Sequence, residues 1–464
     1  MEKRNTFSTS FGFVLAAAGS AVGLGNIWRF PYLAAKDGGG LFLVIYLILA
    51  VTFGFALLTT EVAIGRKTKQ SPLTAYKKMH EKWGWIGKFA CIIPMMILPY
   101  YCVIGGWVLK YAIAFITGQG FEAAGDSYFT GFITSQWSPI VLTVVFLFAC
   151  CYVIYRGVRR GIESISKILM PILVVLVIGI SIFALTIKNV TDDGTIRTGL
   201  QGFKIFVVPD FTGLTLNKFM VTLMDAMGQL FYSLSIAMGI MIAYGSYVND
   251  NDNLVKSVNR IEIFDTAIAF LAGVMIIPTV YVFMGSEGLG KSGPGLMFIA
   301  IPKILAQMGF LGHVVGIIFF VMVFFAALTS AISILEAIVS SFIDRFHISR
   351  RRAVVYEGTI ALVFGILVCL GYNKLYFELP LPNGAVAQIL DVMDYISNNI
   401  LMPVVAIGSC ILVGWVLKPK SVIEEVTRNG EKFGRQKLYV IMVRYVAPVL
   451  LLILLLKSLG IFNI

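Results

Sequence analysis

The sequence predicts an all-α membrane protein that crosses the bilayer many times. Of its 464 residues, 58% are hydrophobic and only 13% are charged, and the mean hydropathy is +0.86. Soluble proteins average about 45–50% apolar and about 25% charged residues, so this composition excludes an ordinary soluble domain. Eleven apolar segments, each long enough for a helical crossing, follow one another without a polar stretch that would form a soluble domain.

In chain order, we expect membrane helices at residues 11–35, 41–65, 89–117, 137–155, 165–187, 219–245, 261–284, 313–343, 353–372, 387–417 and 439–461. With the N-terminus inside, 26 of the 37 Lys and Arg residues lie at cytoplasmic ends and nine at outer ends. This asymmetry follows the positive-inside rule. The net charge of +12 is therefore explained by basic residues at the cytoplasmic ends of the helices and does not indicate a nucleic-acid partner. Eleven crossings leave the C-terminus outside.

Two of the eleven segments are interrupted. The first contains GSAVGLGN at 19–26, and the sixth contains SLSIAMG at 233–239. These segments open two runs of five, so the second run starts from the opposite face of the membrane. We expect inverted repeats at about 11–187 and 219–417, with 439–461 appended. Interrupted segments at matching positions are typical of a transporter site near the bilayer midplane.

An interruption releases backbone groups that an intact helix would use itself. Freed carbonyl groups can bind a cation, and freed N–H groups can bind an anion. We expect Gly19, Gly23 and Gly25 to supply the backbone freedom for this. The alternative is that these glycines only permit close helix packing.

Polar side chains lie at membrane depth near these interruptions, where an ionisable group usually faces a partner or an aqueous path. Asn26 and Arg29 follow the first break, and Asp265 and Asp394 lie in the seventh and tenth segments. For Asp394 the alternative is a side chain that reaches the membrane surface. The available oxygen donors suit a hard cation such as sodium and comprise Asn26, Ser233, Asp265, Thr329 and Ser330. For the hydroxyl groups of Thr329 and Ser330, in the eighth segment, the alternative is a hydrogen bond to a carbonyl group of their own helix.

Five motifs carry a family resemblance. They are GSAVGLGNIWRFPY at 19–32, GGG at 38–40, PYY at 99–101, GQLFYSLS at 228–235 and ALTSAIS at 327–333. With them the chain resembles the neurotransmitter:sodium symporters, especially their bacterial amino-acid transporters of the LeuT type. The resemblance implies the LeuT fold over residues 1–464, a 5+5 inverted repeat plus an eleventh helix, with helices 1 and 6 broken at mid-membrane. It also implies a bacterial plasma membrane location and a monomer or weak homo-oligomer.

The resemblance further implies two sodium sites and an amino acid between them. The first sodium set is Ala21, Asn26, Ser233 and Asp265, completed by the substrate carboxylate. The second set is Gly19, Val22, Ala326, Thr329 and Ser330. The substrate carboxylate would meet Gly23, Gly25 and Tyr101, and its ammonium group would meet carbonyls of Ala21 and the sixth segment. The side-chain pocket would comprise Ser20, Ile97, Tyr101, Tyr232, Ser235, Met238, Ser330 and Ile334.

That pocket contains no acid or base, so a neutral hydrophobic or aromatic amino acid is expected. The flexible thioether of Met238, where many relatives have Phe, predicts broad selectivity. The family's gates match an outer pair of Arg29 and Asp394, often bridged by water, beneath which Tyr101 and Tyr232 form an aromatic lid. The inner gate matches Arg4 with Asp344, supported by Ser246 and Tyr247. Gly161 and Pro171 match a motif that lets the fifth helix unwind, or they are a loop glycine and a tolerated helix proline.

The surroundings of the family's chloride site match Tyr46, Gln229 and Ser233. Asp265 would place a fixed carboxylate there, and Ala269 stands where some relatives have a compensating acid. We therefore expect chloride-independent transport, with proton counter-movement through Asp265 or a neighbour left open.

The leading hypothesis is a sodium-coupled importer of neutral hydrophobic amino acids that uses two sodium ions and no organic cofactor. The alternative is a proton-coupled amino-acid permease of similar fold. An enzyme or channel is disfavoured because the sequence has no nucleotide loop, nucleophile–base constellation or filter motif.

Overall fold

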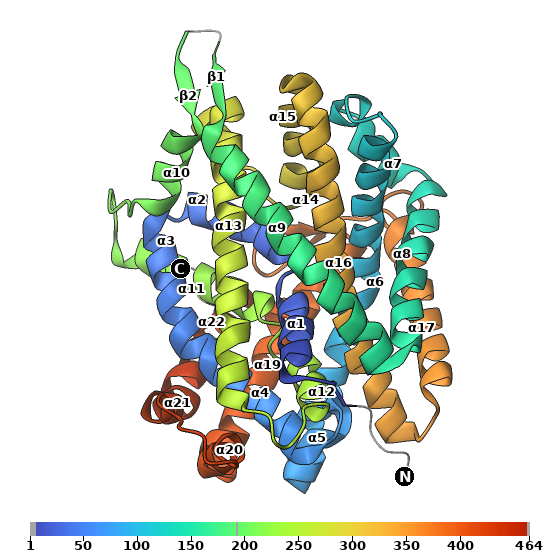
Figure 1. Ribbon diagram of the computed structural model, residues 1–464, viewed down its shortest axis with the longest axis vertical. Coiled ribbons are helices and arrows are strands. Elements are labelled where there is room, and N and C mark those ends of the chain that lie inside the picture. Colours follow the sequence, from blue (N-terminus) through green and yellow to red (C-terminus); the bar gives the residue numbers. More distant parts are fainter. Residues whose placement is uncertain (1–5, 192–193, 462–464) are drawn as a thin grey trace.

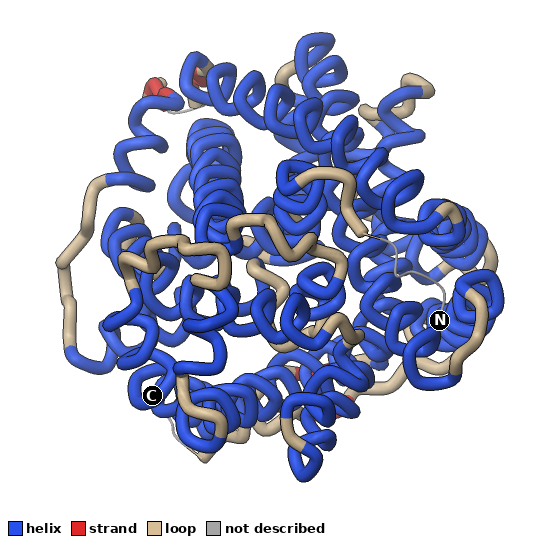
Figure 2. Tube along the Cα trace, turned by 60° about the horizontal axis from the view of Figure 1, so that its bottom comes forward, coloured by secondary structure: helices blue, strands red, loops and turns tan. Residues whose placement is uncertain are grey.

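Helices form nearly all of the molecule, because a chain within a bilayer must satisfy its backbone groups internally (Figures 1 and 2). The computed structural model describes residues 6–191 and 194–461. Over these residues nine helices are long and apolar enough to cross a membrane, and one bent pair makes a tenth span. The remaining expected segment, the sixth, is divided into two short helices.

The nine spans are α3 with α4 (Gly40–Thr68), Glu81–Ile116 containing α6 (Gly84–Ile116), α8 (Ser138–Tyr155), Val158–Thr186 containing α9 (Ser164–Thr186), α13 (Leu254–Gly288), α16 (Gly309–Phe346), α17 (Arg350–Leu370), Ile389–Val416 containing α18 (Ile389–Asp394) and α19 (Met402–Ile411), and Gln436–Ser458 containing α21 (Gln436–Ile441) and α22 (Ala447–Ser458). Each overlaps the segment expected from the sequence.

Shorter elements connect the spans. The helices are α5 (Pro72–Met79), α7 (Tyr128–Thr134), α10 (Gly199–Val207), α14 (Gly293–Gly295), α15 (Ile301–Gln307) and α20 (Lys420–Val426). The strands form two antiparallel hairpins, β1 (Lys188–Val190) with β2 (Ile196–Thr198), where Asn189 lies opposite Arg197, and β3 (Leu379–Pro380) with β4 (Val386–Ala387).

Both expected interruptions are present. The first segment consists of α1 (Ser10–Ala21) and the helix Gly25–Lys36, which contains α2 (Phe30–Lys36), and the two are bent by 52°. The sixth consists of α11 (Leu216–Ser233) and α12 (Ile240–Ser246). Figure 1 shows α1 near the middle of the bundle, where it contacts α9, α13 and α16. The helices α6, α8, α16 and α17 pack against one another, at the right of the view in Figure 1.

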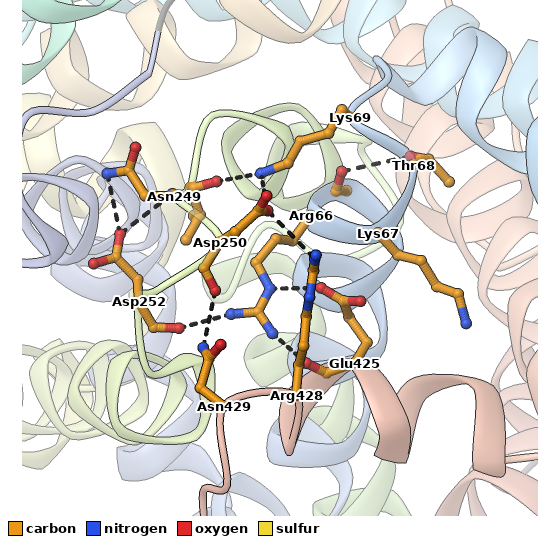
Figure 3. A network of polar contacts seen from close by, with 12 residues as sticks. Arg66, Lys67, Thr68, Lys69, Asn249, Asp250, Asp252, Glu425, Arg428 and Asn429 are labelled. Atoms are coloured by element: carbon orange, nitrogen blue, oxygen red, sulfur yellow. Dashed lines mark hydrogen bonds and ion pairs between the residues drawn. The ribbon is translucent and has the colours of Figure 1, made fainter.

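A polar network holds α4 to α20 and to the loop after α12 at one end of the molecule (Figure 3). The Arg66 side chain is fully buried; it donates to Glu425 Oε1 at 2.6 Å and to the carbonyl of Asp252 at 2.6 Å. Nearby, Lys69 Nζ lies 2.9 Å from Asp250 Oδ1. The network therefore joins α4, the loop after α12 and α20 into one body at this end.

Candidate functional site

A small cavity of about 20 Å³ lies where the two interrupted segments meet. Its lining comprises Ser20, Ala21, Gly23, Leu24, Gly25, Asn26, Ile97, Tyr101, Tyr232, Ser233, Ser235, Met238, Ser330 and Ile334. All eight residues expected to form the side-chain pocket are among them. Of these described lining residues, none is Asp, Glu, Lys, Arg or His, so the cavity offers no ionic partner to a charged side chain.

The glycines of the first break are required by close packing. A Cβ on Gly23 would lie 2.8 Å from Ser330 Oγ, and one on Gly25 would lie 2.9 Å from the Tyr232 ring. Neither glycine has a positive φ, so the expectation that they supply unusual backbone conformations is wrong. They leave room for the side chains that line the cavity.

The second break does use left-handed backbone. Ser235, Ala237 and Gly239 have φ values of 54°, 63° and 73°. The carboxylate of Glu61, buried on α4, accepts a hydrogen bond from Ala237 N at 2.6 Å. This contact holds the unwound segment in place. The role of Glu61 was not predicted, because the position of a glutamate in an apolar helix does not show which neighbour it faces.

Asp265 lies beside the cavity and is fully buried. Its Oδ1 accepts from Ser233 Oγ at 2.5 Å and from Asn26 Nδ2 at 2.9 Å. Its Oδ2 accepts from Tyr46 OH at 3.3 Å. All three of these partners are neutral, and no ion pair to Asp265 occurs within residues 6–191 and 194–461. An ionised carboxylate buried this way lacks a compensating cation.

Gln229 was expected in the surroundings of the family's chloride site, together with Tyr46 and Ser233. Its side chain donates to the backbone of Gly25 and not to Asp265. Its Nε2 donates to the carbonyl of Gly25 at 3.1 Å, and its buried Oε1 has no hydrogen-bond partner in the described part of the chain. Gln229 therefore braces the start of the helix Gly25–Lys36 rather than the carboxylate of Asp265.

A second oxygen cluster joins α1 to α16. Ser330 Oγ lies 3.4, 3.1 and 3.5 Å from the carbonyl oxygens of Gly19, Ser20 and Val22. Thr329 instead donates within α16, to Phe325 O at 3.0 Å and to Ala326 O at 3.2 Å, as the alternative interpretation had it. The expected second set thus gathers in one place, and it consists of neutral oxygens, which suit a hard cation.

A larger cavity of about 450 Å³ lies next to the small one. Arg29 and Tyr232 line it, and Tyr232 is the one described residue that lines both cavities. Within the described residues Arg29 and Asp394 form no direct ion pair, and the expected gate, in which water often bridges the two, stays a prediction. Asp394 Oδ1 accepts instead from Tyr100 OH at 2.9 Å and from Asn398 Nδ2 at 2.6 Å, so its carboxylate is bound inside the fold and does not reach the membrane surface.

At the other end, Arg4 lies outside the described residues. Asp344 Oδ2 accepts from Ser71 N at 2.6 Å, at the start of α5. Ser246 Oγ donates to Ala243 O at 2.5 Å, and Tyr247 OH donates to Glu336 Oε1 at 2.6 Å.

Two further features of this end bear on the expected gate. Arg350 binds both carboxylate oxygens of Glu336, at 2.6 and 2.9 Å. This pair could not be predicted from the sequence, since Glu336 and Arg350 belong to different helices. The fifth span runs unbroken from Val158 to Thr186, so Gly161 and Pro171 do not unwind it in this structure.

Comparison with known proteins agrees with this architecture. The model of the sodium:neurotransmitter symporter family matches residues 4–131 and 130–463. The uncharacterized sodium-dependent transporter YhdH of Bacillus subtilis is 32% identical over 100% of this chain and 99% of its own length. The sodium- and chloride-dependent GABA transporter 2 of Mus musculus is 27% identical over 89% of this chain and 73% of its own length.

The crystal structure of MhsT in complex with L-phenylalanine matches with a TM-score of 0.85 and 33% identity, over 98% of this chain and 100% of that one. MhsT has the LeuT fold, and the homologues carry the names of sodium-dependent transporters. The chain therefore belongs to the sodium:neurotransmitter symporter family and is a multi-pass, sodium-dependent transporter with the LeuT fold.

Proposed function

We propose that the chain imports neutral hydrophobic or aromatic L-amino acids together with sodium by alternating access. The observation that carries this proposal is the pairing of a cavity without acid or base and a buried carboxylate beside it. The cavity suits an uncharged side chain. The Asp265 carboxylate, whose hydrogen-bond partners are neutral, needs a cation to offset its burial.

We propose two sodium ions, carried as cargo. The first would bind the oxygens of Ala21, Asn26, Ser233 and Asp265 together with the substrate carboxylate. The second would bind the oxygens of Gly19, Val22, Ala326, Thr329 and Ser330. The convergence of Asn26 and Ser233 on Asp265, and of α1 carbonyls on Ser330, supports both sets. Because the substrate would complete the first set, sodium and substrate would each raise the affinity for the other.

The substrate's charged ends would lie at the helix ends of the first break. The C-terminus of α1, near Ala21, carries partial negative charge that favours the ammonium group, and the N-terminus at Gly25 favours the carboxylate. The L-phenylalanine in MhsT supports an aromatic substrate here. Met238, which lines the cavity, would adapt to side chains of several shapes.

We propose that transport does not require chloride. A fixed carboxylate already occupies the position where Tyr46 and Ser233 direct their hydroxyl groups, and a chloride ion there would repel it. In this proposal the N-terminus is cytoplasmic and the C-terminus external in a bacterial plasma membrane. Arg29, Asp394, Tyr101 and Tyr232 would close the outer side, and the chain would act as a monomer or weak homo-oligomer.

Uptake of labelled L-phenylalanine into proteoliposomes tests the proposal. We expect uptake under an inward sodium gradient, equal in chloride and in gluconate, and competition by the larger neutral amino acids among the other nineteen. Asp, Glu, Lys and Arg are expected to compete poorly. Sodium-free uptake driven by a pH gradient would instead establish the proton-coupled alternative.

A further inference from the structure

Exposed arginines gather where α8 ends and α17 begins. We call them the arginine patch, and they are Arg156, Arg159, Arg160, Arg351 and Arg352. The helices α8 and α17 pack side by side at the right of Figure 1. Arg350 Nη1 donates to the carbonyl of Ile154 at 3.4 Å and so fixes the start of α17 against the end of α8. Arginines that are far apart in the sequence are therefore neighbours in the fold.

A sharp turn after α8 brings Arg159 and Arg160 back beside Arg156. Gly157 makes this turn with a φ of 85°, which favours glycine. The chain that follows packs on the end of α8, since a Cβ on Gly161 would lie 3.4 Å from Arg156 Cβ. Both arginines of the turn are exposed. The patch is thus held by packing beneath it and faces outward.

The patch has no carboxylate partner within residues 6–191 and 194–461, because none of its arginines forms an ion pair there. The acidic residues of its two segments, 150–167 and 345–372, are Glu163 and Glu357, and both are buried. Like charges this close together repel one another. An anion at the patch would offset that repulsion.

Other arginines near this end of the bundle are neutralised inside the fold. Each binds one carboxylate, and the pairs are Arg66 with Glu425, Arg350 with Glu336 and Arg435 with Glu262. The arginine patch differs from them in that its charges face outward without such a partner.

Exposed tyrosines mark the level of the patch in the membrane. Tyr152, Tyr155 and Tyr356 are 53%, 45% and 54% exposed, and tyrosine is enriched where a membrane meets water. The Arg351 guanidinium lies 5.2 Å from the centre of the Tyr155 ring. The Arg156 guanidinium lies 5.8 Å from the centre of the Tyr152 ring. Both arginines are therefore held at the height of the lipid headgroups.

We propose that the arginine patch binds the phosphate group of an anionic phospholipid, with phosphatidylglycerol as the simplest case. Guanidinium groups match phosphate oxygens with paired hydrogen bonds. A lipid fits better than a free phosphate, because exposed apolar side chains continue along both helices. Phe148 on α8 is 71% exposed and Val355 on α17 is 62% exposed, so acyl chains can lie against them.

The proposed lipid site is separate from the proposed path of the amino acid, since none of the five arginines lines either cavity. A bound headgroup would join α8 to α17 and reduce the repulsion within the patch. The lipid would therefore stabilise the folded chain whether or not an amino acid is bound.

Native mass spectrometry of the full chain in detergent micelles tests the site, with phosphatidylglycerol and phosphatidylcholine as probes. Wild type is expected to bind phosphatidylglycerol at least about tenfold more tightly than phosphatidylcholine. Arg156→Gln combined with Arg351→Gln removes one charge from each helix and should weaken phosphatidylglycerol binding by about tenfold or more. The matched control is Lys432→Gln combined with Lys437→Gln, which removes two exposed charges beside α21 at the same end. This control should stay within about twofold of wild type.

Thermal unfolding in the same micelles gives a second readout. Phosphatidylglycerol should raise the Tm of wild type and of the lysine control, and should raise that of the arginine variant less. If the first arginine variant fails to fold, Arg159→Gln combined with Arg352→Gln repeats the test at two other exposed positions of the patch.

Three results would overturn the proposal. The first is equal binding of the two lipids by wild type. The second is an equal loss in the arginine variant and the lysine control, which would show only the general attraction of a basic surface for anionic lipid. The third is displacement of phosphatidylglycerol by millimolar inorganic phosphate, which would assign the patch to a free anion instead of a lipid.

Discussion

Replacing Asp265 by Asn should make transport depend on chloride. The substitution keeps the shape of the side chain and removes its charge from a site that is fully buried. A sodium ion about 4 Å from a carboxylate is attracted by about 4 kcal/mol at an effective dielectric constant of about 20. Since about 1.4 kcal/mol is a factor of ten, sodium affinity in Asp265→Asn should fall by roughly three orders of magnitude without chloride.

Chloride should restore part of that loss, because the hydroxyls of Tyr46 and Ser233, which now donate to Asp265, remain to hold an anion. The assay is a sodium titration of amino-acid uptake into proteoliposomes, in chloride and in gluconate. Tyr46→Phe is the matched control, since it removes one donor and leaves the charge. That variant alone should stay chloride-independent.

The double variant, Asp265→Asn with Tyr46→Phe, should regain less of its sodium affinity from chloride than Asp265→Asn does, and this non-additivity identifies the shared anion site. Equal sodium dependence of Asp265→Asn in chloride and gluconate would refute the reasoning. It would mean either that the carboxylate does not face the transported sodium or that no anion replaces it.

Three further outcomes are expected. Gly25→Ala should reduce uptake at least about tenfold at normal expression, because its Cβ would lie 2.9 Å from the Tyr232 ring that bounds the cavity. Arg66→Met should cost about 3 kcal/mol of stability and lower Tm by leaving Glu425 buried without its cation, and Glu425→Met in the same chain should recover part of it. Burial and a neighbouring carboxylate raise the pKa of Asp37 to about 6. The folded chain then holds this proton more tightly than the unfolded chain, so the stability from this group is complete below about pH 4 and is lost as the pH rises through about 6. Asp37→Asn should abolish that fall in Tm, and a Tm profile identical to wild type would contradict it.

The membrane helices were predictable because each needs a long apolar run, which a sequence displays directly. The breaks were also predictable, because small and polar residues interrupt the apolar runs at 19–26 and 233–239. The structure confirms helices over all eleven segments and both breaks. The residues of the expected pocket also meet at one cavity.

The contacts that could not be predicted join residues far apart in the sequence. Glu61 and Glu336 lie in apolar helices, and only the packing of those helices shows that they bind Ala237 N and Arg350. The role of Gly23 and Gly25 was predicted wrongly because it too depends on contacts with distant residues. Their role is set by neighbours on other helices, whereas a sequence shows only their local backbone freedom.

The position of Tyr232, which lines both cavities, has a kinetic consequence. At the larger cavity, of about 450 Å³, Tyr232 lines both spaces, and opening by side-chain rotation needs no movement of a helix, so it is faster than a collective motion. On the other side α4 and α12 interlock, and a Cβ on Gly65 would lie 2.2 Å from Ile242 O. Opening there requires helices to move, on a scale of microseconds to milliseconds. In the proposed transport cycle, a bound amino acid should therefore exchange past Tyr232 many times for each opening at α4 and α12, so that binding reaches equilibrium before the slow step.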